Sequence, residues 1–318
     1  MSPAGRRTSA FYRQRKRQQR IRQVQTASFL LFCLAIVGLG LFKAAHSSPA
    51  IPKKTKANVA VSGHSAGSTT AAPTSSEDVQ LQSIVANWAQ KYSFTSTVSV
   101  VELTGQQRTA SLGADNSIVT ASTFKLYVAY GVLHAIEQGK YSLNTITNDG
   151  KTVSADLNTM ILNSDNNAAR TLGFMIGWPQ IDSWLAAQGM THTDTNNYVG
   201  SSTAPVGDKK STAHDLSIFL QKLYAGQLLN ATDTQRLLTL LEKQNYRSGI
   251  PAGVPTGVTV ANKPGWLTPA DGIYEYIQND AGIVYGPKST YVIVVTTAGK
   301  SMSPLADLSK QVYNYLEN

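Results

Sequence analysis

The chain has 318 residues and a formal net charge of +9 at pH 7. The positive charge is concentrated at one end, because residues 1–56 hold twelve Lys or Arg and no acidic residue, whereas the other 262 residues hold sixteen against nineteen acids. This distribution argues against a nucleic-acid-binding domain. The single cysteine, Cys33, excludes an intramolecular disulfide and a cysteine-based metal site.

The N-terminal part predicts a basic tail followed by a membrane span. Residues 1–26 carry eight Lys or Arg, and residues 27–42 carry no charge. As a helix, residues 27–45 can cross the roughly 30 Å hydrocarbon core of a bilayer. Because basic flanks stay in the cytoplasm, we expect residues 1–26 to be cytoplasmic and the chain after this single span to lie outside. A cleaved signal peptide is the alternative.

A polar linker is predicted between the span and the folded domain. Residues 46–76 are rich in Ser, Thr, Ala and Pro and contain no Phe, Trp or Tyr. Such a segment cannot bury enough apolar surface to order itself, so we expect a disordered linker. Residues 77–318 then form one domain, which is large enough to bury a core without disulfides.

Apolar periodicity and turn residues define the expected elements of this domain. In chain order they are a helix capped by Ser75 or Ser76, a hairpin of strands 95–103 and 107–112, a helix from Ser122 to about Gln138, shorter helices within 154–244, strands at 258–263, 279–285 and 291–297, and a terminal helix over 304–316. This order predicts an α+β fold, in which an antiparallel sheet built from both ends of the domain is flanked by helices. An all-helical subdomain is inserted between the two ends.

Ser122 and Lys125 are the first candidates for chemistry. They lie three residues apart at the start of an expected helix, where side chains at i and i+3 share one face. A serine hydroxyl attacks poorly at neutral pH unless a neighbouring base takes its proton, and a desolvated lysine can do so. Alone, the pattern is more often a helix cap followed by a solvated lysine.

Two further motifs follow in the same domain. After Ser122-Thr123-Phe124-Lys125 come Ser164-Asp165-Asn166 and Lys263-Pro264-Gly265, and the first two are the only S-x-x-K and S-D-N sequences in the chain. The ordered set resembles the penicillin-recognising serine hydrolases, and most closely the class A β-lactamase family, whose signature is S-x-x-K, S-D-N and K-T-G. The resemblance covers essentially all of residues 77–318 and implies the fold of that family.

The resemblance also implies catalytic roles. Ser122 would be the acylated nucleophile and Lys125 its proton acceptor. Ser164 would relay a proton to the leaving nitrogen, while Asn166 would bind the substrate amide and orient Lys125. Lys263 would supply positive potential for a substrate carboxylate.

Three other residues would complete the site in such a family member. The backbone N–H groups of Ser122 and Trp266 would form the oxyanion hole. Asp165 would hold its turn, and Gly265 suits a strand edge that a substrate approaches closely.

Two departures from the family pattern bear on activity. Class A β-lactamases use a loop glutamate to activate the deacylating water, but this chain has no Glu between Glu137 and Glu242, and Asp194 and Asp208 are the nearest acids. Pro264 replaces the usual Thr or Ser and removes a hydroxyl that binds the substrate carboxylate. Such a bond to a charged group is worth about 1.5–3 kcal/mol.

The expected protein is a serine hydrolase at the bacterial cell membrane, with its catalytic domain outside the cytoplasm. From the resemblance, it would hydrolyse β-lactam amides through an acyl-Ser122 intermediate. A D-alanyl-D-alanine carboxypeptidase or transpeptidase, and a catalytically silent binding domain, are the alternatives. We expect a monomer that needs no cofactor or metal and binds no nucleic acid, with β-lactams or D-Ala-D-Ala-type cell-wall groups as substrates. A triad using His214 and Asp215 has no geometry to fix it in sequence alone.

Overall fold

The computed structural model describes residues 76–196, 209–268 and 276–318. The predicted tail and membrane span, and the predicted linker up to residue 75, lie outside these residues. None of the helices within the described ranges has the length and apolar character that crossing a bilayer requires.

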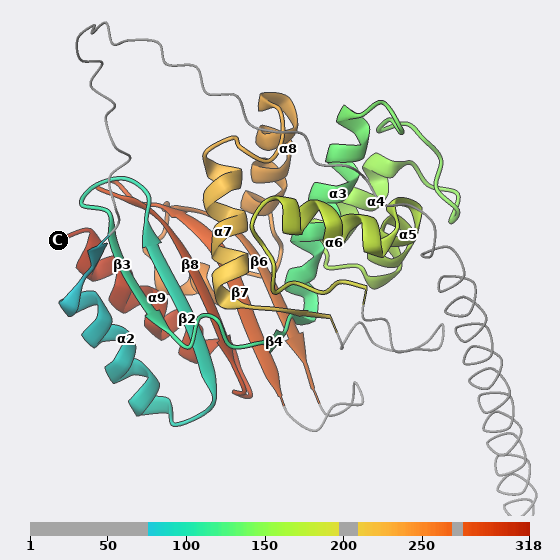
Figure 1. Ribbon diagram of the computed structural model, residues 1–318. Coiled ribbons are helices and arrows are strands. Elements are labelled where there is room, and N and C mark those ends of the chain that lie inside the picture. Colours follow the sequence, from blue (N-terminus) through green and yellow to red (C-terminus); the bar gives the residue numbers. More distant parts are fainter. Residues whose placement is uncertain (1–75, 197–208, 269–275) are drawn as a thin grey trace, which may run out of the picture. The chain divides into compact units, whose positions relative to one another are not determined.

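A six-stranded sheet forms the centre of the domain (Figure 1), and its strand order is β1-β3-β2-β8-β7-β6. The neighbouring strands pair in antiparallel fashion except for the short β1, which runs parallel to β3. The strands are β1 (Ser76–Glu77), β2 (Ser96–Glu102), β3 (Arg108–Leu112), β6 (Thr259–Leu267), β7 (Ile277–Tyr285) and β8 (Thr290–Thr297). The sheet therefore joins both ends of the domain, as predicted, and leaves β6 at one edge.

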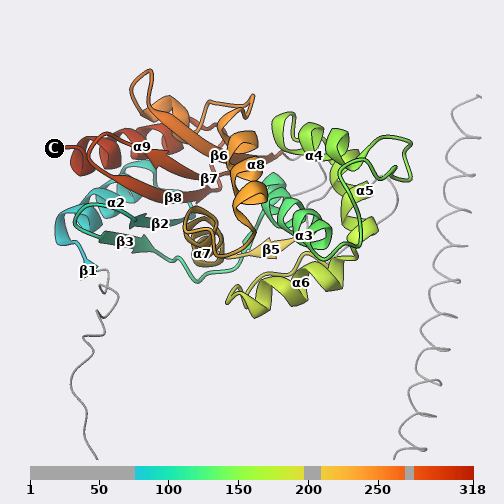
Figure 2. The same ribbon diagram turned by 90° about the horizontal axis from the view of Figure 1, so that it is seen from above.

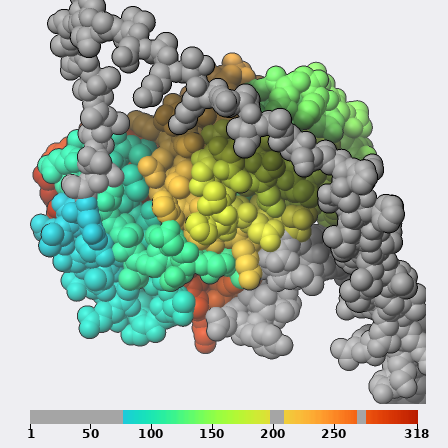
Figure 3. Space-filling model, viewed as in Figure 1, coloured from blue at the N-terminus to red at the C-terminus, as the bar shows by residue number. Residues whose placement is uncertain are grey.

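Helices cover both faces of this sheet. Helices α2 (Val79–Tyr92) and α9 (Ser303–Leu316) pack together on one face, where the buried Trp88 indole donates to Pro304 O at 2.7 Å. On the other face, α7 (Ala213–Tyr224) contacts β2 and β8, and α8 (Ala231–Glu242) contacts β6. Figure 2 shows these layers from above, and in Figure 3 the surfaces of the hairpin, α7 and α6 adjoin one another.

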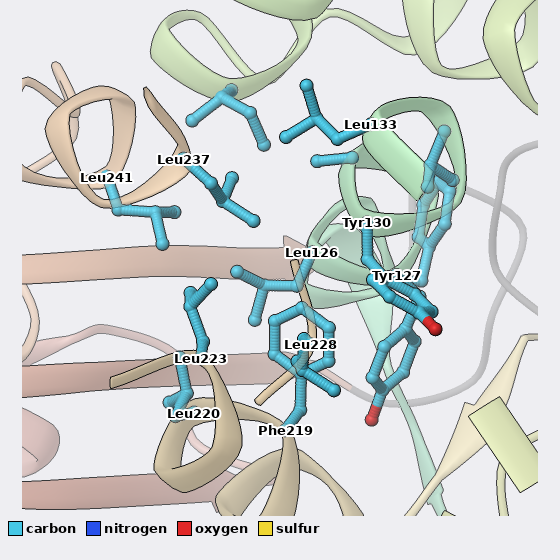
Figure 4. Close-up of a cluster of buried hydrophobic side chains, with 14 of the residues drawn as sticks. Leu126, Tyr127, Tyr130, Leu133, Phe219, Leu220, Leu223, Leu228, Leu237 and Leu241 are labelled. Carbon is cyan, nitrogen blue, oxygen red and sulfur yellow. The ribbon is translucent and has the colours of Figure 1, made fainter. Parts of the chain in front are cut away.

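Helix α3 (Lys125–Glu137) is the centre of the helical part, around which α4 (Val153–Leu162), α5 (Asn166–Ile176) and α6 (Trp178–Ala187) gather. Ten of its thirteen residues are buried, so it is apolar on nearly all sides, as a central helix must be. Its side chains meet those of α7 and α8 in one cluster (Figure 4), which includes Leu126, Tyr127, Tyr130, Leu133, Phe219, Leu220, Leu223, Leu237 and Leu241. This packing fixes the start of α3, where Lys125 directly follows the short 3₁₀ helix that carries Ser122.

The structure corrects two predicted boundaries. Helix α2 is capped by Asp78, which accepts from the Leu81 amide at 2.7 Å, and not by Ser75 or Ser76. Ser76 pairs with Arg108 in the sheet instead. The helix predicted from Ser122 begins as a short 3₁₀ helix, η1 (Ala121–Phe124), and becomes α-helical at Lys125. Residue propensities do not distinguish a 3₁₀ from an α-helical first turn or fix the exact first residue of a helix. Tertiary contacts therefore set where α2 and α3 begin.

The helical insert is also less separate than predicted. Helix α7 lies within the predicted 154–244 block but packs directly on β8 and β2. Between the two regions, β4 (Ile118–Val119) and β5 (Lys210–Ser211) form a small second sheet. Strand β6 extends to Leu267, past the predicted end at residue 263, so the whole Lys263-Pro264-Gly265 motif lies on a strand.

Candidate active site

Ser122 lies in the 3₁₀ helix that leads into α3, where its side chain is half-buried. The preceding residue, Ala121, has φ of 46°, a left-handed conformation that non-glycine residues rarely adopt. The turn is held by Thr123, whose hydroxyl donates to Thr120 O at 2.7 Å. Backbone strain of this kind persists only where surrounding contacts over-determine it, and it is frequent at active sites.

Lys125 reaches three oxygen atoms from the start of α3. Its Nζ lies 2.6 Å from Ser122 Oγ, 2.7 Å from Asn166 Oδ1 and 3.3 Å from Ser164 Oγ. In a 3₁₀ helix residues three apart are eclipsed, which explains the short contact with Ser122. The Lys125 side chain is fully buried, and burial lowers its pKa to about 7, against the opposing effect of the Asp165 carboxylate.

A neutral Lys125 amine can therefore act as a base at physiological pH. The Asn166 side-chain oxygen can only accept a hydrogen bond, so it takes one N–H of the amine. The lone pair of a neutral amine is then available to the Ser122 hydroxyl. This geometry would allow Lys125 to take the proton of the Ser122 hydroxyl and so activate it as a nucleophile.

The Ser164-Asp165-Asn166 turn places the second serine between two amines. Ser164 has φ of 56°, and Asp165 caps α5 by accepting from the Ala168 amide at 2.8 Å. Asn166 is the first residue of α5. Ser164 and Asn166, on either side of this capping residue, both lie within hydrogen-bond distance of Lys125 Nζ.

Lys263 approaches Ser164 from the sheet side. Its Nζ donates to Ser164 Oγ at 3.0 Å and to Pro264 O at 2.9 Å. The side chain is fully buried, and its pKa is lowered well below the ordinary value by burial and by Lys125, with Asp280 opposing. Ser164 thus touches two amines, an arrangement that lets a hydroxyl pass a proton in either direction.

Gly265 allows β6 to approach the nucleophile. A Cβ atom placed on Gly265 would lie 2.5 Å from the backbone nitrogen of Ser122 and 2.9 Å from that of Thr123. No side chain fits there, so the backbones of β6 and η1 are in direct contact. Pro264 is tolerated because β6 is an edge strand. Trp266 follows next, with its side chain 37% exposed.

The described residues provide no carboxylate partner for the nucleophile. Neither Ser122 nor Lys125 is hydrogen-bonded to an acidic side chain within the described ranges. Asp194 pairs through its backbone with Lys210 at the second sheet, and Asp208 lies outside the described residues. Over the same ranges, no group of His, Cys, Asp and Glu could hold a metal ion.

The histidine triad left open by the sequence is not assembled. His214 Nδ1 lies 2.6 Å from Asp115 Oδ1, and the Asp215 carboxylate accepts from the His192 amide and the Thr193 hydroxyl. Neither group is hydrogen-bonded to Ser122.

Sequence reasoning did not identify the loop after α8 as part of the site. Asn245 Nδ2 donates to Asn163 Oδ1 at 2.6 Å, one residue before Ser164. The ring of Tyr246 packs against that of Trp266, with centroids 4.9 Å apart. Asn245 and Tyr246 lie in a loop without a motif, so only the tertiary structure shows that this loop contacts the residue before Ser164 and the strand that carries Lys263.

Several solved structures resemble this chain in fold. A structure of a PBP-A point mutant, in an acyl-enzyme complex with penicillin G, superposes with a TM-score of 0.68 at 21% identity and covers 77% of this chain and 99% of its own. An ancestral class A β-lactamase matches with a TM-score of 0.65 at 21% identity, over 74% of this chain and 100% of its own. A β-lactamase from Xanthomonas campestris pv. campestris gives 0.64 at 18%, over 74% and 97%.

No curated protein matches the chain. These structural likenesses show the fold. The model of the β-lactamase enzyme family matches residues 80–316, which is most of the chain. The chain therefore belongs to the β-lactamase enzyme family and has the class A-like serine hydrolase fold.

Proposed function

We propose that this protein is a serine acyl hydrolase that acts on β-lactam or D-Ala-D-Ala-type amides through an acyl-Ser122 intermediate. The observation that carries the proposal is the 2.6 Å contact between Ser122 Oγ and the buried Lys125 amine, whose pKa is about 7. A base with a pKa near the operating pH is the most effective at taking the hydroxyl proton.

The residues support each step of acylation. Ser122 Oγ attacks the amide carbonyl as its proton passes to Lys125. The N–H groups of Ser122 and Trp266 would stabilise the oxyanion. The C–N bond then breaks, and the leaving nitrogen takes its proton from the Ser164 hydroxyl. Ser164 is replenished by the amines of Lys125 and Lys263, which lie 3.3 Å and 3.0 Å from its oxygen.

Deacylation separates two activities. In a β-lactamase, water hydrolyses the acyl-Ser122 ester rapidly, and the family model favours this activity. Rapid hydrolysis needs a base placed for that water, yet no described carboxylate contacts Ser122 or Lys125. This observation favours a slowly deacylating, penicillin-binding D,D-peptidase as the second candidate.

Intact-protein mass spectrometry distinguishes these activities. The full-length protein is mixed with penicillin G, and the adduct mass is followed over time, with Ser122→Ala as the control. An adduct that disappears while the drug is hydrolysed identifies a β-lactamase, and a persistent adduct identifies a penicillin-binding peptidase. No adduct on the wild-type protein, or an equal adduct on Ser122→Ala, would overturn the proposal.

The location of the enzyme is part of the proposal. The basic segment 1–26 and the uncharged run 27–42 within the predicted span 27–45 support a single membrane anchor that places the hydrolase outside the cytoplasm. Protease treatment of intact cells should remove the domain while leaving a membrane-bound N-terminal fragment. Protection of the domain from the protease would contradict this orientation.

A further inference from the structure

A small cavity lies on the central sheet, beside the segment that leads to Ser122. It has a volume of about 220 Å³, and its walls come from the starts of β2 and β7, the end of β8 and the short strand β4. Drug-sized sites usually measure about 300–1,000 Å³, but an apolar cavity of about 150 Å³ can already hold benzene. This cavity therefore has room for a molecule of one ring or two fused rings.

A row of three polar side chains crosses the sheet at this cavity. Thr97 is opposite Thr296, and Thr296 is opposite Asn279. Residues paired in this way project from the same face of a sheet, and all three line the cavity. The hydroxyls of Thr97 and Thr296 lie 2.8 Å apart and satisfy each other. The third member of the row, Asn279, takes no part in that hydrogen bond.

The Asn279 amide offers an acceptor to this cavity. Its side chain is only 1% exposed, and its Nδ2 donates to Val119 O at 2.9 Å. Its Oδ1 accepts no hydrogen bond from any residue that the structure describes. Turning the amide over would place Oδ1 against Val119 O, so the contact with Val119 fixes which atom is left over. A buried acceptor without a partner costs free energy that a ligand with an N–H or O–H group would recover.

The other walls of the cavity select against a charged ligand. Ile118, Ile277 and Ala298 supply apolar surface, and none of the described residues that line the cavity carries a charge. The Lys300 amine lies 5.8 Å from the centroid of the Tyr276 ring, but Lys300 is exposed and is not part of the lining. An ion would lose its hydration here without gaining an opposite charge, so a neutral molecule is favoured.

We infer that this cavity is a binding site for a neutral, ring-bearing small molecule whose N–H or O–H group donates to Asn279 Oδ1. Its ring would pack on the apolar walls. The lining contains none of the four side chains Ser122, Lys125, Ser164 and Lys263, so this binding is separate from the proposed acylation. Because Val119 lies three residues before Ser122, the ligand would contact the segment that leads to the nucleophile.

Indole and benzofuran test this inference, because they have nearly the same shape and only indole carries an N–H donor. The affinity of the full-length protein for each compound is measured by ligand-observed NMR titration. Indole should bind roughly three- to tenfold more tightly than benzofuran, which is the gain from one additional hydrogen bond. Ser122→Ala should bind both compounds as the wild-type protein does, since Ser122 is not part of the cavity.

Two substitutions separate the hydrogen bond from the space. Asn279→Ala removes the acceptor and leaves the cavity open, so benzofuran should still bind and the preference for indole should fall below about twofold. Ala298→Leu places a larger side chain in the cavity and should weaken both compounds about tenfold or more. Ala186→Leu is the matched control and should change neither affinity, because Ala186 is exposed on α6 and does not line the cavity.

Three results would overturn the inference. They are the absence of saturable indole binding by the wild-type protein, equal affinities of that protein for indole and benzofuran, and unchanged binding of both compounds by Ala298→Leu. The second and third results decide the question even if Asn279→Ala does not fold. None of these measurements depends on an adduct at Ser122, so failure of the proposed function would appear in the penicillin experiment alone.

Discussion

Replacing Lys125 by methionine tests whether this amine loses its proton near neutral pH. Burial lowers its pKa from the ordinary 10.5 to about 7 in the folded protein, whereas the unfolded chain regains the ordinary value. Between these two pKa values the unfolded state binds more protons than the native state. The free energy of unfolding of the wild-type protein should therefore rise with pH across this window.

The two pKa values set the size of the effect. From pH 6 to pH 9 they correspond to about 2–3 kcal/mol of added stability, which a methionine cannot provide. Lys125→Met should thus lose about this much stability relative to wild type over the same range. Lys125 also lowers the pKa of Lys263, so its removal brings Lys263 nearer to its ordinary value. That change acts in the same direction and adds to the difference.

Urea unfolding of the full-length protein at pH 6, 7, 8 and 9, followed by tryptophan fluorescence, measures this difference. Lys91→Met is the control, because Lys91 is exposed, binds Asp307 at 2.8 Å and has a raised pKa. Its stability relative to wild type should not change between pH 6 and pH 9. If the Lys125→Met difference varies by less than about 0.5 kcal/mol over this range, Lys125 keeps an ordinary pKa and cannot be the base.

Three further substitutions address the site. Ser164→Ala should slow acylation by penicillin G about a hundredfold or more, because the leaving nitrogen loses its proton donor; a loss below threefold would remove Ser164 from the mechanism. Gly265→Ala should lower the free energy of unfolding by about 1–3 kcal/mol and abolish adduct formation, since its Cβ would overlap the Ser122 backbone. Calorimetry and mass spectrometry check both effects, and wild-type values would contradict the contact. Asp165→Asn keeps the cap but removes a charge that raises the pKa of Lys125, so the pH profile of acylation should move to lower pH. A profile unmoved or shifted upward would show that Asp165 does not act on Lys125.

The sequence predicted much of the fold because local signals agreed with the tertiary structure. The hairpin, the last two strands and the terminal helix were found close to their observed bounds from alternation and turn residues. The order of elements also predicted a sheet built from both ends. Only the choice of neighbours within that sheet, with β8 between β2 and β7, required the structure.

The site was predicted less completely, for a physical reason. Motifs and spacing named the residues that now surround Ser164, but two of the decisive conformations are left-handed, at Ala121 and Ser164. Nothing in those side chains favours positive φ, so the surrounding contacts must impose it. The pairing of Tyr246 with Trp266 also depends on a loop whose course is set by tertiary contacts.

The pairing of β2 with β8 has a consequence for how the protein is made. Ser96 of β2 is opposite Thr297 of β8, so β2 cannot form this pairing until β8, one of the last elements, has been synthesised. Contacts so distant in sequence carry a high loop-closure entropy and slow the search for the native state. Until β8 emerges, β2 keeps an open edge that other chains can pair with, so the nascent domain is vulnerable to aggregation. Ser122 and Lys125 are synthesised early, but the candidate active site can assemble only after the strands that complete the sheet have been synthesised.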